Sequence, residues 1–114
     1  MSTTSLPFMP FFGGDFLRVT SGWSLEERGA LLMLEIAQWE NGYLPTDPIR
    51  LARIAQIDSE TFSRVWPIVS AQFVQMGPGL INEALAELRE KSQSRAEVRS
   101  RKARHAATER WQRD

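Results

Sequence analysis

A helix that is apolar on nearly every side constrains this chain more than any other feature. Ser24-Leu-Glu-Glu27 has the spacing of a capping box, in which the serine hydroxyl and the glutamate carboxylate each accept from the other residue's backbone N–H. The apolar residues from Ala30 to Trp39 then cover most of the circumference of the helix. Since such a helix has to be buried, we expect residues 24–40 to form the central helix of the domain. Asn41-Gly42 should end it through a left-handed cap.

Three shorter segments follow this helix, and the second and third begin with helix-start signals. Tyr43-Leu44 reads as a short extended piece. Asp47-Pro48, an N-cap followed by proline at the first helical position, predicts a helix over residues 48–56. Asp58 is the expected cap of the next helix, which Pro67 should kink or divide, because proline removes a backbone donor and clashes with the preceding turn.

The rest of the chain predicts a hairpin and a long helix. Phe73 to Met76, then Gly77-Pro78-Gly79, then Leu80-Ile81 has the pattern of a small β-hairpin. From Glu83 the sequence looks helical to near the C-terminus. Before the central helix, residues 1–22 lack periodicity, and we expect an irregular arm that packs its aromatic side chains onto the body; these are Phe8, Phe11, Phe12 and Phe16.

This order of elements is the layout of a winged-helix domain. Leu51 to Trp66 has the spacing of a helix-turn-helix, with the small Ala52 where the helices cross and Ile57 in the turn. The predicted fold is therefore mainly α, a winged helix-turn-helix with a small β-hairpin wing and a long basic C-terminal helix. The expected divisions are an N-terminal arm (1–22), a winged-helix domain (23–88) and a basic helix or tail (89–114). One buried cluster should contain Leu31, Leu34, Trp39, Leu51, Ile54, Ile57, Phe62 and Val65.

The charges are unevenly distributed, although the formal net charge is zero. Residues 1–88 carry five arginines and ten acidic residues, a balance of −5, whereas residues 89–114 carry nine Lys or Arg and four acidic residues, a balance of +5. An acidic body with a basic tail indicates that a polyanion would be bound by the tail.

The tail places its cations on one side of a helix. At about 100° per residue, six of them fall within a stripe about 100° wide, with Glu109 the one acidic residue among them. Arg101 and Arg104 lie on the other side, near acidic residues. Such a stripe can follow a phosphate backbone, either as a solvated helix or as an arm that becomes ordered on binding. The stripe consists of Lys91, Arg95, Arg99, Lys102, Arg110 and Arg113.

The presumed reading helix has poorer chemistry for DNA. Arg64 is the one residue at its groove-facing positions with a guanidinium fork that reads guanine, and we include it among the predicted nucleic-acid contacts. Asp58 and Glu60 would repel phosphates, and the wing contains no Lys or Arg. The alternative is that this helix pair is a platform that meets protein.

Several classes of function are not expected. With no cysteine and one histidine, His105, the chain lacks the usual sets for nucleophilic triads and zinc sites, so we predict no enzyme activity, no metal and no cofactor. Glu35 and Glu40 look like carboxylates of a helix surface. No segment has the length of a membrane span or the pattern of a signal peptide, so we expect a cytoplasmic protein with no membrane partner.

Seven segments follow one another in a characteristic order: Met9–Leu17, Leu25–Leu34, Gly42–Asp47, Leu51–Ala55, Val65–Pro67, Lys91-Ser92 and Lys102–Trp111. In this order they resemble the YdaU-like proteins of phages and prophages. The resemblance implies a winged-helix fold and a place near phage DNA-replication genes, with no catalytic activity and no cofactor. Family members often carry basic residues in the wing strand, where this chain has Leu80-Ile-Asn-Glu-Ala84.

Two hypotheses for function follow. The first is a phage- or prophage-derived DNA-binding accessory protein, acting in DNA replication or its regulation through the basic tail. The second is a non-enzymatic interaction module, in which the acidic body docks on a host or phage protein and blocks or recruits it. Both hypotheses are compatible with a homo-oligomer.

Overall fold

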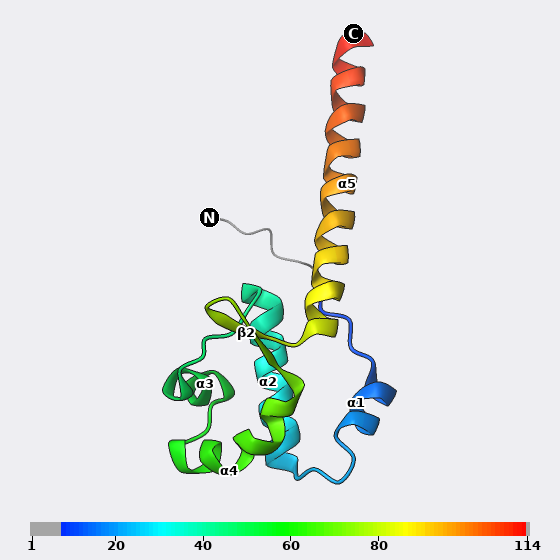
Figure 1. The fold of residues 1–114 in the computed structure, drawn as a ribbon. Coiled ribbons are helices and arrows are strands. Elements are labelled where there is room, and N and C mark those ends of the chain that lie inside the picture. Colours follow the sequence, from blue (N-terminus) through cyan, green and yellow to red (C-terminus); the bar gives the residue numbers. More distant parts are fainter. Residues whose placement is uncertain (1–7, 114) are drawn as a thin grey trace.

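The computed structural model describes the backbone of residues 8–113 and the side chains of residues 8–109. The side chains of Arg110 and Arg113, two of the predicted contacts, therefore lie outside the described residues. Five α-helices, a short 3-10 helix and a two-stranded hairpin make up this part of the chain (Figure 1). In chain order they are α1 (Gly13–Val19), α2 (Leu25–Asn41), α3 (Pro48–Ala55), α4 (Ser59–Val69), η1 (Ser70–Gln72), β1 (Val74–Met76), β2 (Gly79–Ile81) and α5 (Glu83–Arg113).

The central helix is confirmed. Both hydrogen bonds of the capping box are present, since the Ser24 hydroxyl accepts from the Glu27 N–H at 3.1 Å and the Glu27 carboxylate accepts from the Ser24 N–H at 2.8 Å. Gly42 ends α2 with a φ of 93°, which glycine adopts without steric cost. α3, α4 and α5 all pack against α2 (Figure 1).

The core lies between α2, α3 and α4. Five of the eight predicted side chains belong to it, and Ile54 and Ile57 are partly buried against it. Trp39 is buried outside this cluster, because it is rotated about 80° around α2 from Leu31. The buried cluster contains Ala30, Leu31, Leu34, Leu44, Leu51, Ala52, Ala55, Phe62, Val65, Val69 and Phe73.

The hairpin is confirmed and has a third segment beside it. β1 and β2 are antiparallel, with Val74 opposite Ile81 and a turn at Gly77-Pro78, where Gly77 has a φ of 59°. Leu44 forms an isolated bridge to Leu80, and the two residues exchange backbone hydrogen bonds of 2.9 Å. The extended piece predicted at Tyr43-Leu44 is therefore attached to β2, which gives an arrangement compatible with a wing.

Polar contacts attach the start of α5 to α2. The fully buried Gln38 amide donates to the Asn82 carbonyl at 3.0 Å and accepts from the Asn82 N–H at 2.7 Å. The Asn82 side chain in turn accepts from the Leu85 N–H at 3.1 Å, as an N-cap does. The Arg89 guanidinium donates to the Trp39 and Glu40 carbonyls at the end of α2. Together these contacts fix the direction in which α5 leaves the body.

The prediction of an irregular arm with packed aromatic side chains is wrong in two respects. The arm is not irregular throughout, because residues 13–19 form α1, which Arg28 holds by donating to the Thr20 carbonyl at 3.2 and 3.3 Å. Of its aromatic side chains, Phe16 packs on the core, whereas Phe8, Phe11 and Phe12 are 71, 51 and 57% exposed.

The helix containing Pro67 is not divided there. α4 continues to Val69, which is fully buried. The proline removes the one bond that would reach the carbonyl of Ser63, and Ser63 is exposed, so water can satisfy that oxygen. Packing of Val65 and Val69 then keeps the last turn helical.

The molecule is elongated because α5 projects beyond the body (Figure 1). The principal extents are 65 × 30 × 22 Å. The boundary expected between residues 88 and 89 falls inside α5, whose first turns pack on the body through the buried Leu85. None of the described helices combines the length and the apolar character needed to cross a membrane.

Candidate functional site

The predicted stripe lies on the projecting part of α5. Because the helix is continuous, Lys91, Arg95, Arg99 and Lys102 fall within about 80° of one another around its axis and along about 16 Å of its length. All four side chains are exposed. A row of exposed cations on one side of a continuous helix can contact successive phosphates.

The cations of the stripe differ in their partners. The Lys91 ammonium lies 3.5 Å from the Glu87 carboxylate. No described acidic side chain forms an ion pair with Arg95, Arg99 or Lys102. Among the cations of the stripe whose side chains the structure describes, these three are therefore the ones whose full charge is available to an anion.

On the opposite face of α5 the arginine side chains contact other residues of the same helix. The Arg101 guanidinium lies 4.0 Å from the Glu97 carboxylate, and the Arg104 guanidinium donates to the Ser100 hydroxyl at 3.3 Å. The His105 Nε2 lies 3.0 Å from the carboxylate of Glu109, the acidic residue of the stripe. The cations of this face are partly satisfied within the helix.

The structure places Arg64 away from the stripe, on α4. Its guanidinium lies 3.6 Å from the Glu26 carboxylate at the start of α2 and donates to the Thr61 hydroxyl at 3.4 Å. Asp58 is exposed beside it, and the hydrogen bond from the Thr61 backbone lowers the pKa of this carboxyl below its usual value. The exposed face of α4 thus keeps its negative charge, and its one cation already has a partner.

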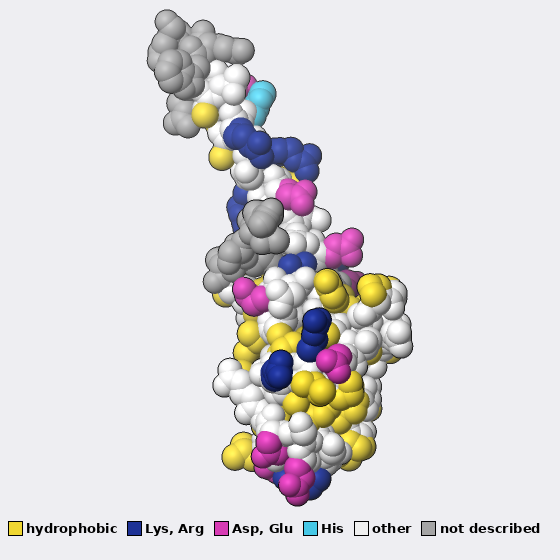
Figure 2. Space-filling view, turned by 90° about the vertical axis from the view of Figure 1, so that its left-hand side faces the viewer, with side chains coloured by type: hydrophobic (Ala, Val, Ile, Leu, Met, Phe, Trp, Pro, Cys, Tyr) yellow, Lys and Arg dark blue, Asp and Glu magenta, His cyan; other side chains and the backbone are white. Residues whose placement is uncertain are grey.

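Two arginines of the body form a second cationic surface that was not among the predicted site residues. Arg50 and Arg53, one turn apart on α3, line a shallow hollow beside Tyr43. Tyr43 packs so closely on Gly79 of the hairpin that a Cβ there would lie 2.7 Å from its ring. Figure 2 shows basic side chains among hydrophobic ones on this face of the body, with further basic side chains above them on the projecting helix. The spacing of the two arginines on a capped helix was the signal in the sequence.

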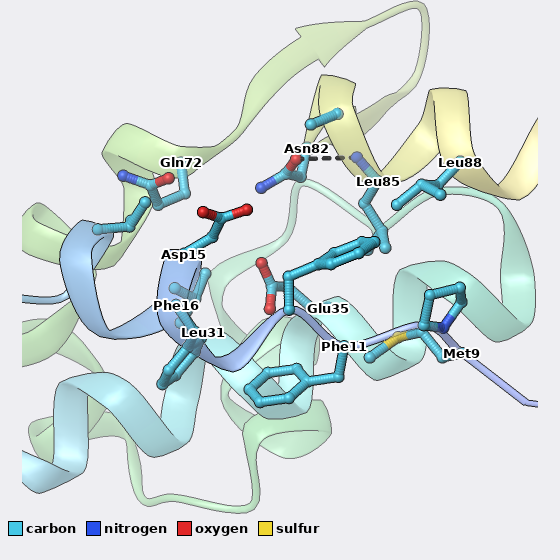
Figure 3. Close-up of a pocket in the computed structure, with 14 residues that line it drawn as sticks. Met9, Phe11, Asp15, Phe16, Leu31, Glu35, Gln72, Asn82, Leu85 and Leu88 are labelled. Carbon is cyan, nitrogen blue, oxygen red and sulfur yellow. Dashed lines mark hydrogen bonds between the residues drawn. The ribbon is translucent and has the colours of Figure 1, made fainter.

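A pocket of about 250 Å³ lies between α1, α2 and the start of α5. The carboxylate groups of Asp15 and Glu35 both point into it (Figure 3). Glu35 is thus half-buried and not a carboxylate of the open surface, and burial raises its pKa to about 7. Its place on a helix that is apolar nearly all round was the available signal. No described group of three or more His, Cys, Asp or Glu could hold a metal ion.

Changing Glu35 to Gln should stabilise the protein at pH 8 and have little effect at pH 4. With a pKa of about 7 in the folded state against 4.5 in the unfolded chain, the folded protein retains a proton that the unfolded chain loses. The stability from this group is therefore full below pH 4.5 and is lost as the pH rises through 7. Because solvent still reaches part of this carboxylate, we expect the free energy of unfolding of the Glu35→Gln protein, measured by urea unfolding at pH 8, to rise by about 1–2 kcal/mol.

The control for this change is Glu40→Gln, which alters an exposed carboxylate further along α2. Its effect on the free energy of unfolding should be within about 0.5 kcal/mol at both pH values. Destabilisation of the Glu35→Gln protein at pH 8 would mean that the carboxylate has a stabilising partner in solution.

These elements define a class: a small, mainly helical domain with a two-stranded hairpin and a projecting basic helix. Residues 7–89 match the family described as "Protein of unknown function (DUF1376)", and the chain belongs to this family. It is 33% identical over 112 residues to the "Uncharacterized protein YdaU" of Escherichia coli (strain K12), across 90% of this chain and 39% of that protein. The resemblance to YdaU-like proteins is thereby confirmed. The chain spans about two fifths of the length of this relative. No solved structure matches it.

Proposed function

We propose that this chain is a winged-helix, non-enzymatic DNA-binding protein that contacts the phosphate backbone through α5. The observation that carries the proposal is the row formed by Arg95, Arg99 and Lys102, which is exposed on a continuous helix and has no described acidic partner. Phosphate contacts from Lys and Arg dominate the affinity of proteins for DNA. A row of such groups along one side of a helix supplies affinity without base recognition.

The winged-helix part of the proposal rests on the arrangement of α3, α4 and the hairpin. The small Ala52 is buried where α3 and α4 pack together, and Phe62 and Val65 face back into the core. The Leu44 bridge extends the hairpin, as the first strand of a wing would. Because Arg64 is engaged by Glu26, base reading by α4 is a small part of the proposed activity, and we expect little sequence preference.

Arg50 and Arg53 supply cations to the body in the same proposal. Of its five arginines, Arg18 pairs with Asp15, Arg28 binds the Thr20 carbonyl and Arg64 pairs with Glu26. The two on α3 form no ion pair with a described residue. A role in phage DNA replication or its regulation is the part of the proposal that comes from the resemblance to phage and prophage proteins.

The test measures DNA binding by the whole chain at a series of salt concentrations. Fluorescence anisotropy of a short labelled duplex and of a labelled single strand is the readout. The three phosphate contacts of α5 should contribute about −3 to the slope of log affinity against log salt on duplex DNA, and contacts by Arg50 and Arg53 should make the slope steeper. The affinity should then fall at least about 40-fold between about 50 and 200 mM salt, and equally for unrelated sequences. A slope near zero, or no binding at low salt, would contradict the proposal and leave the protein-docking hypothesis in its place.

A further inference from the structure

The pocket between α1, α2 and α5 combines apolar walls with two carboxylates. Aromatic and aliphatic side chains from the arm and from α5 form most of its lining, and the Leu31 side chain contributes from α2 (Figure 3). Asp15 and Glu35 are the titratable groups that line it, and Gln72 and Asn82 are its other polar residues. None of the described lining residues is Lys or Arg. The stripe on α5 does not account for this site.

The hydrogen-bonding capacity of the pocket is mostly unused. No described residue donates a hydrogen bond or forms an ion pair with the Glu35 carboxylate. Asp15 is paired with Arg18 through Oδ1, which leaves Oδ2 without a described partner. The Asn82 carbonyl oxygen Oδ1 already accepts from Leu85, and its amide nitrogen is directed toward Asp15 (Figure 3). The open positions are therefore chiefly acceptors.

Acceptors beside aromatic rings select an organic cation. Carboxylates attract positive charge, and the faces of phenyl rings add a favourable cation–π interaction with a guanidinium or ammonium group. Phe11 and Phe16 line the pocket together with the two carboxylates, and their rings lie tilted at 51° with centroids 5.3 Å apart. A hydrated metal ion would need more oxygen ligands than two carboxylates in an apolar setting provide. A phosphate would be repelled.

We propose that this pocket binds an arginine side chain presented by a partner protein. Its volume suits one long side chain with an apolar stem. The planar guanidinium of that side chain would bond chiefly the Glu35 carboxylate, with Oδ2 of the largely exposed Asp15, whose Oδ1 is paired with Arg18, as the further acceptor. The rim is the reason to assign a polypeptide and not a free amine. Phe11, Phe12 and Val19 line the pocket and remain substantially exposed, as does the neighbouring Phe8. A free amine would leave this apolar surface in water, whereas flanking residues of a peptide would cover it.

The experiment uses the whole chain and a matched pair of peptides, acetyl-Phe-Arg-Phe-amide and the same peptide with the uncharged isostere citrulline in place of arginine. Binding is measured by calorimetry at pH 8 and by NMR of the Glu35 carboxyl carbon. The arginine peptide should bind about tenfold more tightly, because the charged hydrogen bond is lost in the isostere. Burial raises the pKa of Glu35 to about 7, so the carboxylate is mostly ionised at pH 8 and mostly protonated at pH 6. The affinity of the protein for the arginine peptide should therefore be about tenfold higher at pH 8 than at pH 6.

Two variants separate the pocket from general attraction to an acidic body. Glu35→Gln should abolish both the preference for arginine and the pH dependence, while Glu40→Gln should leave both unchanged. DNA binding by α5 should be the same in the parent protein and in both variants. Failure of the arginine-pocket proposal is therefore distinguishable from failure of the proposed DNA-binding function. Equal affinity for the two peptides, or an equal loss in both variants, would overturn the proposal. Dissociation of a homodimer by Glu35→Gln alone would also overturn it, because a second copy would then be the occupant.

Discussion

Replacing Phe62 with alanine is expected to lower the free energy of unfolding by about 3–5 kcal/mol, the range for a fully buried phenylalanine. Phe62 is 4% exposed and lies in the cluster that joins α4 to α2 and α3. Its ring stacks on Trp66 with centroids 5.2 Å apart and planes 21° apart, so the change also removes an aromatic contact. Since a domain of this size is stable by about 5–15 kcal/mol, the loss is a large fraction of the total.

The measurement is urea unfolding, in which the midpoint should fall while the slope with denaturant stays the same. The matched control is Ser63→Ala, the next residue of α4, which is exposed and should change stability by no more than about 0.5 kcal/mol. A loss below about 1 kcal/mol for Phe62→Ala would show that α4 does not pack on α2 as described. The helix-turn-helix arrangement proposed for α3 and α4 would then lose its basis.

Changing Arg95, Arg99 and Lys102 together to alanine should reduce DNA affinity for all sequences alike. Each lost phosphate contact removes nearly one unit from the slope of log affinity against log salt, so the slope should become shallower by up to about three units. At about 0.1 M salt this corresponds to a loss on the order of 10²–10³-fold. Folding stability should hardly change, because the three side chains are exposed on the projecting part of α5 and alanine favours helix.

The control is Arg101→Ala with Arg104→Ala on the opposite face. These guanidiniums are engaged by Glu97 and Ser100, so the loss of affinity per removed charge should be smaller. Equal losses per charge on the two faces would indicate that the tail acts as a flexible polycation and not as a helical stripe. No loss in either variant would place the DNA contact elsewhere, with the hollow beside Arg50 and Arg53 the next surface to change.

Local signals predicted most of the helices and the hairpin. These signals involve only residues that are close together in the chain. They are the capping box at Ser24, the aspartates before α3 and α4, and the glycines at residues 42 and 77. Their hydrogen bonds and permitted dihedral angles are the same in almost any surrounding fold, so the sequence states them directly. The cationic stripe is of the same kind, because it depends on the helical period alone.

The tertiary structure decided what depends on residues that are distant in the chain. α1 has only seven residues and is marginal alone, but Phe16 on the core and Arg28 at its end hold it. The Gln38–Asn82 pair joins residues 44 positions apart and directs α5, and no local pattern announces it.

The chemistry of individual charges was likewise decided by packing. Glu35 and Glu40 look alike in the sequence, yet the arm and α5 cover the first, raising its pKa to about 7, while the second stays exposed. Arg64, the best candidate for reading a base, meets Glu26 from the start of α2. The sequence by itself determined which helices form and where the cations of α5 lie around its axis. Only the tertiary structure decided which charges are buried, paired or open, because desolvation and ion pairing depend on the elements that pack around each group.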